Sequence, residues 1–299
     1  MEFIIMLLLD TITLRPYVFV FFLAYLLGCT LHLGLARAVL FGLAGYAIAW
    51  LSEFSSIHTG FPYGSYYYIE TTRGREIWVL GVPLMDSLSY VFLAYASYSL
   101  ALLILAPVRR SGWVVYVLET RELRVSLFTA LLAAVLFMYL DIIIDPVALQ
   151  GHRWFLGQIY GYPEEGVYFG VPLSNFAGWF LTGFGLMLAL QKIDAALSTR
   201  KLPDYAGYRH RWRYLIGPGL YFGVLLFNLA VTFAIGEQLM AWSGLFIVLL
   251  PLLLLVSIVR IKLSIRDAEE EWAAHLRDFP SVAGPRDSVP SPGERLPAA

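Results

Sequence analysis

The sequence predicts an all-α, multi-pass membrane protein, a helix bundle with about seven transmembrane helices. Hydrophobic residues make up 59% of the 299 residues and charged residues only 14%, whereas a soluble domain carries about 25% charged residues. The apolar residues occur in long stretches rather than at scattered core positions. In addition, the phrase GVPLMD at residues 81–86 returns as GVPLSN at residues 170–175, which indicates an internal repeat.

Seven stretches are long enough to cross a hydrocarbon core about 30 Å thick, which takes about 20 helical residues. They are residues 16–35, 38–57, 86–106, 125–145, 171–190, 215–235 and 239–260. The apolar stretch at residues 3–10 is too short to cross, and it follows an acidic residue, Glu2, where a signal peptide carries positive charge. We expect this stretch to lie at the membrane interface.

Basic residues are distributed unequally between the two sides of the predicted bundle. Alternating the seven spans places 17 of the 21 basic residues on one side. Only Arg15, Arg73, Arg75 and Arg153 fall on the other side. Because basic residues favour the cytoplasmic side, we expect a protein of the cell membrane whose C-terminus is cytoplasmic.

A polar tail follows the last span. It opens with the charged run DAEEEWAAHLRD at residues 267–278, which favours a helix, and ends in a Pro-rich polar stretch with too little apolar surface to fold. We therefore expect a transmembrane helical domain at residues 1–266 and a largely disordered cytoplasmic tail at residues 267–299. The formal net charge of −1 gives no indication of nucleic-acid binding, and we expect none.

Each copy of the repeated phrase opens a helix that runs inward from the predicted outer face. Pro fits the first turn of a helix, because its missing N–H would be unpaired there, and the preceding Gly permits a tight turn. The polar residue that follows, Asp86 or Asn175, lies about one turn into a span. A polar group at that depth is costly when it faces lipid, so both side chains are expected to face the interior.

The similarity extends upstream of the phrase and defines a repeating unit. Glu53 precedes Asp86 by 33 residues, and Asp141 precedes Asn175 by 34. The unit is an outward helix with an acidic outer end, a loop rich in Gly and Tyr, and an inward helix. Because both outward helices run in the same direction, we expect a parallel repeat whose acidic ends converge on one cavity. A chance alignment of Gly, Tyr and Pro is the alternative.

The motif DIIID places Asp141 and Asp145 four residues apart, on one helix face with their β-carbons about 5–6 Å apart. At an effective dielectric constant of about 20, two negative charges at that distance repel each other by about 3 kcal/mol, so we do not expect both to be ionised. Pro146 predicts that the helix ends at Asp145, where the helix dipole opposes a negative charge. Asp86, at a helix N-terminus, is expected to be ionised. Alternatively, these acids could neutralise Arg73 or Arg153 or cap loops.

Motifs for nucleotides, metals and nucleophilic catalysis are not found in the sequence. It has no Gly-rich nucleotide loop, no GxSxG motif, no pair of His at metal-ligand spacing and no CxxC. The loops on the predicted outer side are instead rich in Tyr and Trp. Most of these are expected to anchor the membrane interface, but aromatic faces also stabilise a cation. An acid beside an aromatic cavity suits the protonation of an alkene.

Residues 50–190 resemble the carotenoid biosynthesis membrane-protein family, which includes the carotenoid hydratases that act on the acyclic (ψ) end group, of the γ-carotene and bisanhydrobacterioruberin hydratase type. The resemblance rests on the segments EFSSIHTGFPYGSYYY, GVPLMDSLSY, DIIIDPVALQGHRW and IYGYPEEGVYFGVPLSNFAGW. It implies the addition of water across the terminal double bond of a linear carotenoid, giving a tertiary alcohol, without a cofactor or metal. The expected partners are a hydrophobic carotenoid and the lipid bilayer.

The roles of individual residues follow from the chemistry rather than from the resemblance. A proton is expected from the pair of Asp141 and Asp145, and either of them could be the donor. Water is expected to be oriented by Glu53, Asp86 or Asn175, acting as general base or hydrogen-bond partner. The residues expected to bind the substrate are Tyr63, Tyr66, Trp154, Tyr160, Asn175 and Trp179.

Two other functions fit parts of the same pattern. The DxxxD motif is similar to the metal-diphosphate motifs of intramembrane prenyltransferase-like enzymes that act on carotenoids. Binding a diphosphate through Mg²⁺, however, requires a second carboxylate cluster and several basic residues. Activity that persists in EDTA would exclude it. A proton-coupled transporter also holds carboxylates in a cavity, usually near the membrane midplane. Uptake into proteoliposomes without any change to a carotenoid would favour it.

Overall fold

The computed structural model describes residues 2–111, 114–200, 202, 204, 208–264 and 269–282. Within these residues, seven helices are long and apolar enough to cross a membrane, which confirms the predicted multi-pass helix bundle. These helices are α2 (Pro16–Leu33), α3 (Leu35–Thr59), α4 (Leu84–Leu105), α6 (Leu127–Leu149), α7 (Leu173–Thr199), α8 (Ile216–Ala234) and α9 (Gln238–Ser264). The shorter helices are α1 (Glu2–Leu14), which contains residues 3–10, α5 (Arg121–Arg124) and α10 (Glu269–Asp278). Single turns of 3-10 helix occur at Glu70–Thr72, Gly151–Arg153 and Pro280–Val282, and a longer 3-10 segment at Tyr208–Leu215.

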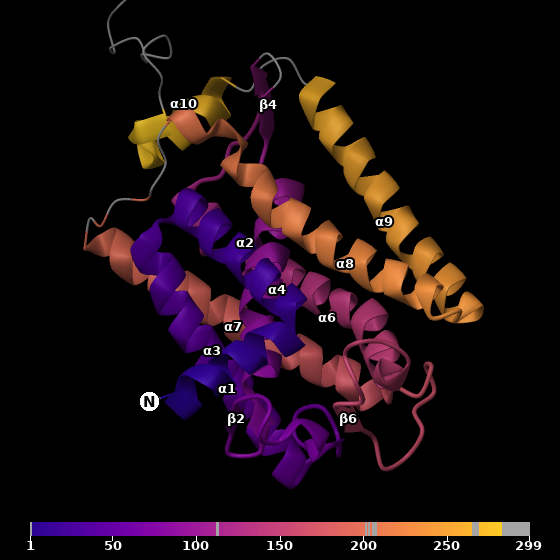
Figure 1. The fold of residues 1–299 in the computed structure, drawn as a ribbon. Coiled ribbons are helices and arrows are strands. Elements are labelled where there is room, and N and C mark those ends of the chain that lie inside the picture. Colours follow the sequence, from indigo (N-terminus) through magenta and orange to yellow (C-terminus); the bar gives the residue numbers. More distant parts are fainter. Residues whose placement is uncertain are drawn as a thin grey trace, which may run out of the picture.

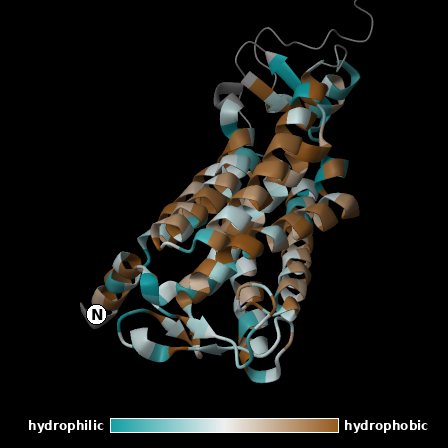
Figure 2. Cartoon of the chain, turned by 90° about the vertical axis from the view of Figure 1, so that its right-hand side faces the viewer, coloured by the Kyte–Doolittle hydropathy of each residue, from teal (hydrophilic) through white to brown (hydrophobic). Residues whose placement is uncertain are grey.

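The bundle has two polar ends separated by a hydrophobic middle. Figure 2 shows hydrophobic residues along the middle of the helices and hydrophilic residues gathered toward both ends. At one end lie the loops of residues 60–83 and 150–172, which we call the GVPL end, and at the other lies α10, which we call the tail end (Figure 1). Helix α9 runs beside α8 at the edge of the bundle, and its apolar side chains are largely exposed, as for Leu239 at 74% and Phe246 at 68%. A helix of this kind suits contact with lipid.

Helix α4 forms the centre of the bundle. Every residue from Tyr90 to Leu103 is buried, and the helix contacts α2, α3, α6 and α8. Four helices form a ring, since α3 contacts α4 and α7, and α6 contacts the same two helices. The predicted parallel repeat requires two neighbouring helix pairs, and α3 with α4 and α6 with α7 are such pairs; the symmetry itself stays a prediction.

The two copies of the repeated phrase have matching backbone conformations. The residues before the phrase, Leu80 and Phe169, have φ values of 50° and 48°, and Gly81 and Gly170 have φ values of 86° and 85°. Only Gly adopts such positive φ angles without steric cost. Pro83 and Pro172 are the N-cap residues of α4 and α7, one position before the first helical turn where Pro was predicted. The extended ψ of an N-cap residue suits Pro as well, and its missing N–H costs no hydrogen bond there.

Short strands join the loops at the GVPL end. Strand β1 (Tyr67–Tyr68) of the first unit pairs antiparallel with β6 (Tyr160–Gly161) of the second, with Tyr68 opposite Tyr160. Strand β2 (Trp78–Val79) pairs with β3 (Val82–Pro83) in a hairpin that leads into α4. A third pair, β4 (Val108–Ser111) and β5 (Val114–Val117), lies at the tail end. The β1–β6 pair therefore links the two repeating units directly.

The predicted end of α6 at Asp145 is wrong, because the helix continues through Pro146 to Leu149. Proline removes one backbone hydrogen bond inside a helix, but the helical turn after Pro146 is stabilised by other contacts. Val147 is buried, and its carbonyl oxygen accepts a hydrogen bond from the indole N–H of Trp154 at 3.0 Å. Asp145 is thus one turn inside α6.

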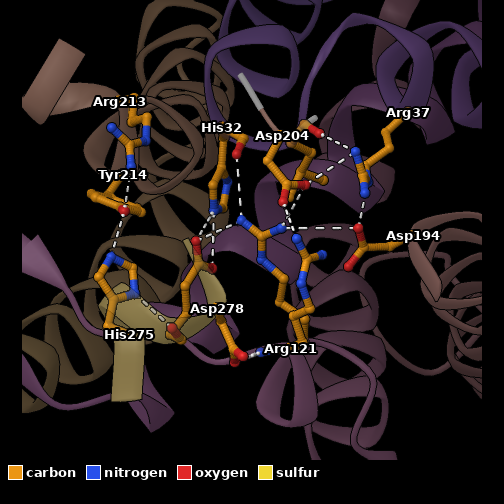
Figure 3. A network of polar contacts seen from close by, with 12 residues as sticks. His32, Arg37, Arg121, Asp194, Asp204, Arg213, Tyr214, His275 and Asp278 are labelled. Atoms are coloured by element: carbon orange, nitrogen blue, oxygen red, sulfur yellow. Dashed lines mark hydrogen bonds and ion pairs between the residues drawn. The ribbon is translucent and has the colours of Figure 1, made fainter. Parts of the chain in front are cut away.

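Charged residues at the tail end form a buried network (Figure 3). Arg124 Nη2 donates to Glu119 Oε1 at 2.8 Å, and His32 Nε2 lies 3.0 Å from the same oxygen. Asp204 Oδ1 lies 3.0 Å from Arg37 Nη1 and 3.3 Å from Arg124 Nη1. Burial alone would raise the pKa of Glu119, but Arg124 and His32 outweigh it and hold that pKa well below its usual value. The network joins α2, α3 and α5 through ion pairs rather than apolar contacts.

Helix α10 docks on this network. His275 Nδ1 lies 2.6 Å from the carbonyl oxygen of Glu119, and its Nε2 lies 3.1 Å from the hydroxyl of Tyr214. Asp278 Oδ2 accepts a hydrogen bond from the backbone N–H of Arg121 at 2.7 Å. The expected helix in the charged run at residues 267–278 is therefore confirmed for Glu269–Asp278. Residues 283–299 lie outside the described part of the chain, and the division into a transmembrane domain and a disordered tail stays a prediction.

We predict that Gly178→Ala destabilises the protein. A β-carbon at this position of α7 would lie 2.5 Å from Tyr63 Cδ1 and 2.7 Å from the carbonyl oxygen of Pro62, and such overpacking costs about 1–3 kcal/mol. Gly185→Ala in the same helix is the control, because nothing lies within 4 Å of its β-carbon and Ala favours a helix by about 0.5–1 kcal/mol. Thermal unfolding in detergent should show a lower Tm for Gly178→Ala only. Equal Tm values for the two variants would contradict the close packing.

We also predict that docking of α10 weakens in acid. Burial lowers the pKa of His275, although its contact with the Glu119 carbonyl acts in the other direction. A group with a lowered pKa contributes its stability above the ordinary value of about 6.5 and loses it as the pH falls. Hydrogen exchange in residues 269–278, corrected for the intrinsic rate, should be faster at about pH 5.5 than at about pH 7.5. His275→Asn should remove this difference, and equal protection of the natural protein at both pH values would refute the prediction.

Candidate functional site

A cavity opens at the GVPL end between the four helices of the ring, α2 and α8. It encloses about 900 Å³ of space between protein atoms, part of it open to the surroundings. All of the acidic, aromatic and amide residues that were selected from the sequence line it. They are Glu53, Tyr63, Tyr66, Asp86, Asp141, Asp145, Trp154, Tyr160, Asn175 and Trp179. The structure thus brings the predicted residues together, while their roles stay predictions.

Asp141 and Asp145 on α6 face Asn175 on α7. The amide nitrogen of Asn175 donates to Asp141 Oδ2 at 2.6 Å and to Asp145 Oδ2 at 3.0 Å. All three residues are buried, with exposed fractions of 4% or less. Asn175 is the third residue of α7, so the GVPL turn that starts this helix also positions its amide between the two carboxyl groups.

Two tyrosines complete the surroundings of Asp145. Tyr162 donates to Asp145 Oδ2 at 2.7 Å, and Tyr160 donates to Asp145 Oδ1. Burial, followed by the charge of Asp145, raises the pKa of both hydroxyls, so both remain neutral donors. Asp145 therefore accepts three hydrogen bonds from the loop and from α7.

Asp141 has a different environment. Its Oδ2 accepts the one bond from Asn175, and its Oδ1 is buried and has no hydrogen-bond partner within the described residues. Hydrogen bonds to a carboxylate favour its charged form, so Asp145, with three donors, is the better place for a single negative charge. The sequence had favoured a neutral Asp145 at a helix end, and the continuation of α6 removes that reason.

The first repeating unit contributes a second pair of acids. Ser87 donates to Glu53 Oε2, and Asp86 lies in the first turn of α4. The hydroxyl of Tyr68 is affected by both carboxyl groups. Burial raises its pKa most, followed by the charge of Asp86 and then by that of Glu53. Glu53 and Ser87 are 34 residues apart, the same separation as Asp141 and Asn175.

Aromatic rings form the wall of the cavity beside these acids. The ring of Trp179 stacks on Tyr90 at 4.6 Å between centroids and lies 4.8 Å from Phe137. Tyr63 donates from its hydroxyl to Thr182 at 2.9 Å. Tyr66 lies 6.2 Å from Tyr160, centroid to centroid, across the two loops.

Part of the cavity lining comes from α2, α4 and α8 and is largely apolar; we call it the apolar arm. It consists of Tyr17, Phe21, Phe92, Leu93 and Val224. None of these was selected from the sequence, because an apolar residue in an apolar helix gives no sign of which neighbour it faces. Trp154 also lines the cavity, and its ring lies 6.2 Å from that of Tyr17, centroid to centroid.

Further polar residues line the cavity and were not selected, among them Tyr68, Tyr162 and Asn228. Tyr68 and Tyr162 belong to the Tyr-rich loops, but that position does not separate membrane anchoring from cavity lining. Asn228 on α8 also lines the cavity, and its amide nitrogen donates to the carbonyl oxygen of Val224 at 2.9 Å. A lone Asn in a transmembrane span was a signal that could have been used.

The alternative in which nearby arginines neutralise the acids is not observed. Arg153 pairs with Glu237, and Arg73 pairs with Glu70. Among the residues that the structure describes, no Lys or Arg forms an ion pair with the four cavity acids, and no group of three or more His, Cys, Asp or Glu could hold a metal ion. The four carboxyl groups therefore depend on hydroxyl and amide donors.

We predict that Asp141 contributes a protonated carboxyl group to the infrared spectrum of the purified protein at neutral pH. A buried carboxyl group with one donor beside a charged neighbour retains its proton. Asp141→Asn should reduce the carboxylic-acid carbonyl band that shifts in D₂O. Asp10→Asn is the control, because Asp10 is exposed on α1. An unchanged band in Asp141→Asn would show that the proton is elsewhere.

Comparison with known proteins gives a family and one relative. Residues 4–251 match the family described as carotenoid biosynthesis protein. The chain is 31% identical over 204 residues to a bisanhydrobacterioruberin hydratase of Haloarcula japonica, and the match covers 65% of this chain and 60% of that protein. No solved structure matches the chain. Because the family match spans most of the 299 residues, this multi-pass membrane protein belongs to the carotenoid biosynthesis protein family.

Proposed function

We propose that this protein is a carotenoid hydratase that adds water to the terminal double bond of an acyclic carotenoid end group, by acid catalysis, to give a tertiary alcohol. The observation that carries the proposal is Asp141, a buried acid with one oxygen that has no hydrogen-bond partner within the described residues, in a cavity that aromatic and apolar side chains also line. The printed name of the Haloarcula japonica relative, a hydratase, supports the same reaction class.

Asp141 acts as the proton donor in this mechanism. Asn175, Tyr160 and Tyr162 stabilise a negative charge on Asp145, and that charge, four residues away on the same helix face, keeps the proton on Asp141. The proton passes to the less substituted carbon of the double bond, because this leaves the positive charge on the tertiary carbon. Asn175 stabilises the carboxylate that remains on Asp141.

The cation that forms is stabilised by its surroundings. The rings of Tyr90 and Trp179 line the cavity that holds the acids, and Phe137 packs against both rings. A cation over an aromatic face gains about 0.5–2 kcal/mol. The negative charge on Asp145 adds an attraction that is strong in a buried site. Tyr160 and Tyr162 donate their hydrogen bonds to Asp145 and so stabilise this charge beside the cation.

Water is activated by the other pair of acids. Glu53 and Asp86 line the same cavity from α3 and α4, and a carboxylate there accepts a proton from the water that attacks the cation. The apolar arm between α2, α4 and α8 holds the adjoining polyene chain. A carotenoid is a rod about as long as the hydrocarbon core is thick, about 30 Å, so its end group meets water only at a polar end of the bundle. We place the GVPL end on the outer side of the cell membrane, in line with the distribution of basic residues.

The proposal predicts a gain of one water per reacting end in a host that makes an acyclic carotenoid such as lycopene, measured by mass analysis of extracted pigments. Asp141→Asn and Asp145→Asn should each reduce the hydrated product at least about 100-fold, the usual contribution of general acid catalysis. Exposed Asp10→Asn should behave as the natural protein. Product formation at the natural rate by both cavity variants would overturn the acid assignment, and the absence of any hydrated pigment with the natural protein would overturn the proposed function.

A further inference from the structure

A second polar cluster lies next to the cavity at the GVPL end. Arg15, the N-cap residue of α2, and Glu76, in the loop before β2, are buried with exposed fractions of 1% and 2%. Arg15 Nη2 lies 3.5 Å from Glu76 Oε1, a long distance for an ion pair. Thr72 donates to the same oxygen of Glu76. The pair is therefore buried without close charge-assisted contact.

Three buried polar atoms, on Arg15, on Glu76 and on Trp78 two residues further along, have no hydrogen-bond partner within the described residues. They are Arg15 Nε, Glu76 Oε2 and the indole nitrogen of Trp78, all buried. Residues 76 and 78 are two apart in extended chain, which directs their side chains to the same side. Buried polar groups without a protein partner bind water. Two donors and one acceptor match three of the four hydrogen bonds that a water molecule can make.

The cluster adjoins the part of the cavity that contains Asp86. Trp78 is paired with Pro83 in the β2–β3 hairpin, and the backbone N–H of Leu84 donates to the carbonyl oxygen of Ile77 at 2.9 Å, so this segment lies beside the first turn of α4. The ring of Trp78 meets the cavity-lining Tyr68 edge to face at 5.9 Å.

Two further observations connect the cluster with the cavity. Arg15 is two residues before Tyr17, which lines the cavity. Arg15 and Glu76 are also among the charged groups that act on the Asp86 carboxyl. Tyr17 and Tyr68, which both line the cavity, are thus neighbours of the cluster, Tyr17 along the chain and Tyr68 through its contact with Trp78.

We propose that Arg15, Glu76 and Trp78 bind the water that the hydration reaction consumes and supply it to Asp86. This inference rests on the proposed function. The bound water gives its oxygen lone pair to the tertiary cation, a carbon–oxygen bond forms, and the excess proton of the resulting oxonium passes to the carboxylate of Asp86 or Glu53. The cluster takes no part in protonation of the alkene. The proton for that step comes from Asp141, in the other pair of acids.

This separation of roles can be measured as a ratio. If the cation forms but water does not reach it, a proton returns to a carboxylate and the alkene is restored. In D₂O the added atom is deuterium, and the restored alkene carries it whenever the carbon loses its original hydrogen instead. Label in recovered substrate therefore reports protonation, and the alcohol reports water capture. A residue that only supports the fold would lower both signals together, whereas a residue that supplies water lowers the alcohol alone.

The test uses the full-length protein in membranes with an acyclic carotenoid in D₂O. Trp78→Phe keeps the ring and removes the indole N–H, and Glu76→Gln removes the charge and keeps the shape. Each should lower the rate of alcohol formation about fivefold to tenfold, the effect of one lost hydrogen bond, while deuterium exchange into recovered substrate is retained. The control is Trp50→Phe, because the indole N–H of Trp50 already donates to the backbone carbonyl of Val79 at 3.0 Å.

The outcomes separate the inference from the function on which it rests. A higher ratio of deuterated substrate to alcohol in Trp78→Phe and Glu76→Gln, but not in Trp50→Phe, supports the water site. A ratio equal to that of the natural protein in both variants, or an equal change in Trp50→Phe, overturns it. If Glu76→Gln does not fold, Trp78→Phe alone decides. Neither exchange nor alcohol with the natural protein would instead refute the proposed function.

Discussion

Burying carboxyl groups among apolar helices requires hydrogen-bond donors, and the arrangement at the GVPL end supplies them. An unpaired charge in such a site costs several kcal/mol, and the described residues provide no arginine or lysine to the four cavity acids. The donors are instead Tyr160 and Tyr162 from a loop, Asn175 from the first turn of α7 and Ser87 from α4. The loops must therefore fold back over the helix ends, and the β1–β6 pair holds them there.

The two repeating units share a framework but not their chemistry. Aligning the two GVPL phrases, which are 89 residues apart, places Asp141 and Asp145 opposite Ser52 and Ser56. Those serines bind the first loop, since Ser52 contacts the hydroxyl of Tyr63 and Ser56 donates to the carbonyl oxygen of Gly64. Glu53 is one position further along and contacts Ser87 rather than the residue equivalent to Asn175. One unit thus carries two adjacent acids, and the other carries a separated pair.

The spans and the composition of the site could be predicted because both follow from the free energy of exposing apolar groups to water or polar groups to lipid. Twenty apolar residues in a row have few alternatives to crossing a membrane, and polar residues inside such spans avoid lipid, so Glu53, Asp86 and Asp141 were expected to converge. The apolar arm around Phe21 and Val224 could not be predicted, since hydrophobicity does not show which neighbour a side chain faces. The network at the tail end was missed for a related reason. Arg37 and Arg124 lie near the ends of predicted spans, where charged residues usually face water at the membrane interface, and only the tertiary fold buries them. The end of α6 was misplaced because Pro146 removes one hydrogen bond, which the packing around Val147 tolerates.

The β1–β6 pair has one strand from each half of the chain, so the roof over the acids is a single shared structure. Both helix pairs line the same cavity under this roof, so the proposed reaction has one site there rather than one in each pair. A symmetric rod-shaped molecule that is altered at both tips must accordingly withdraw, turn around and enter again, or visit a second polypeptide. Singly altered products would then accumulate before doubly altered ones.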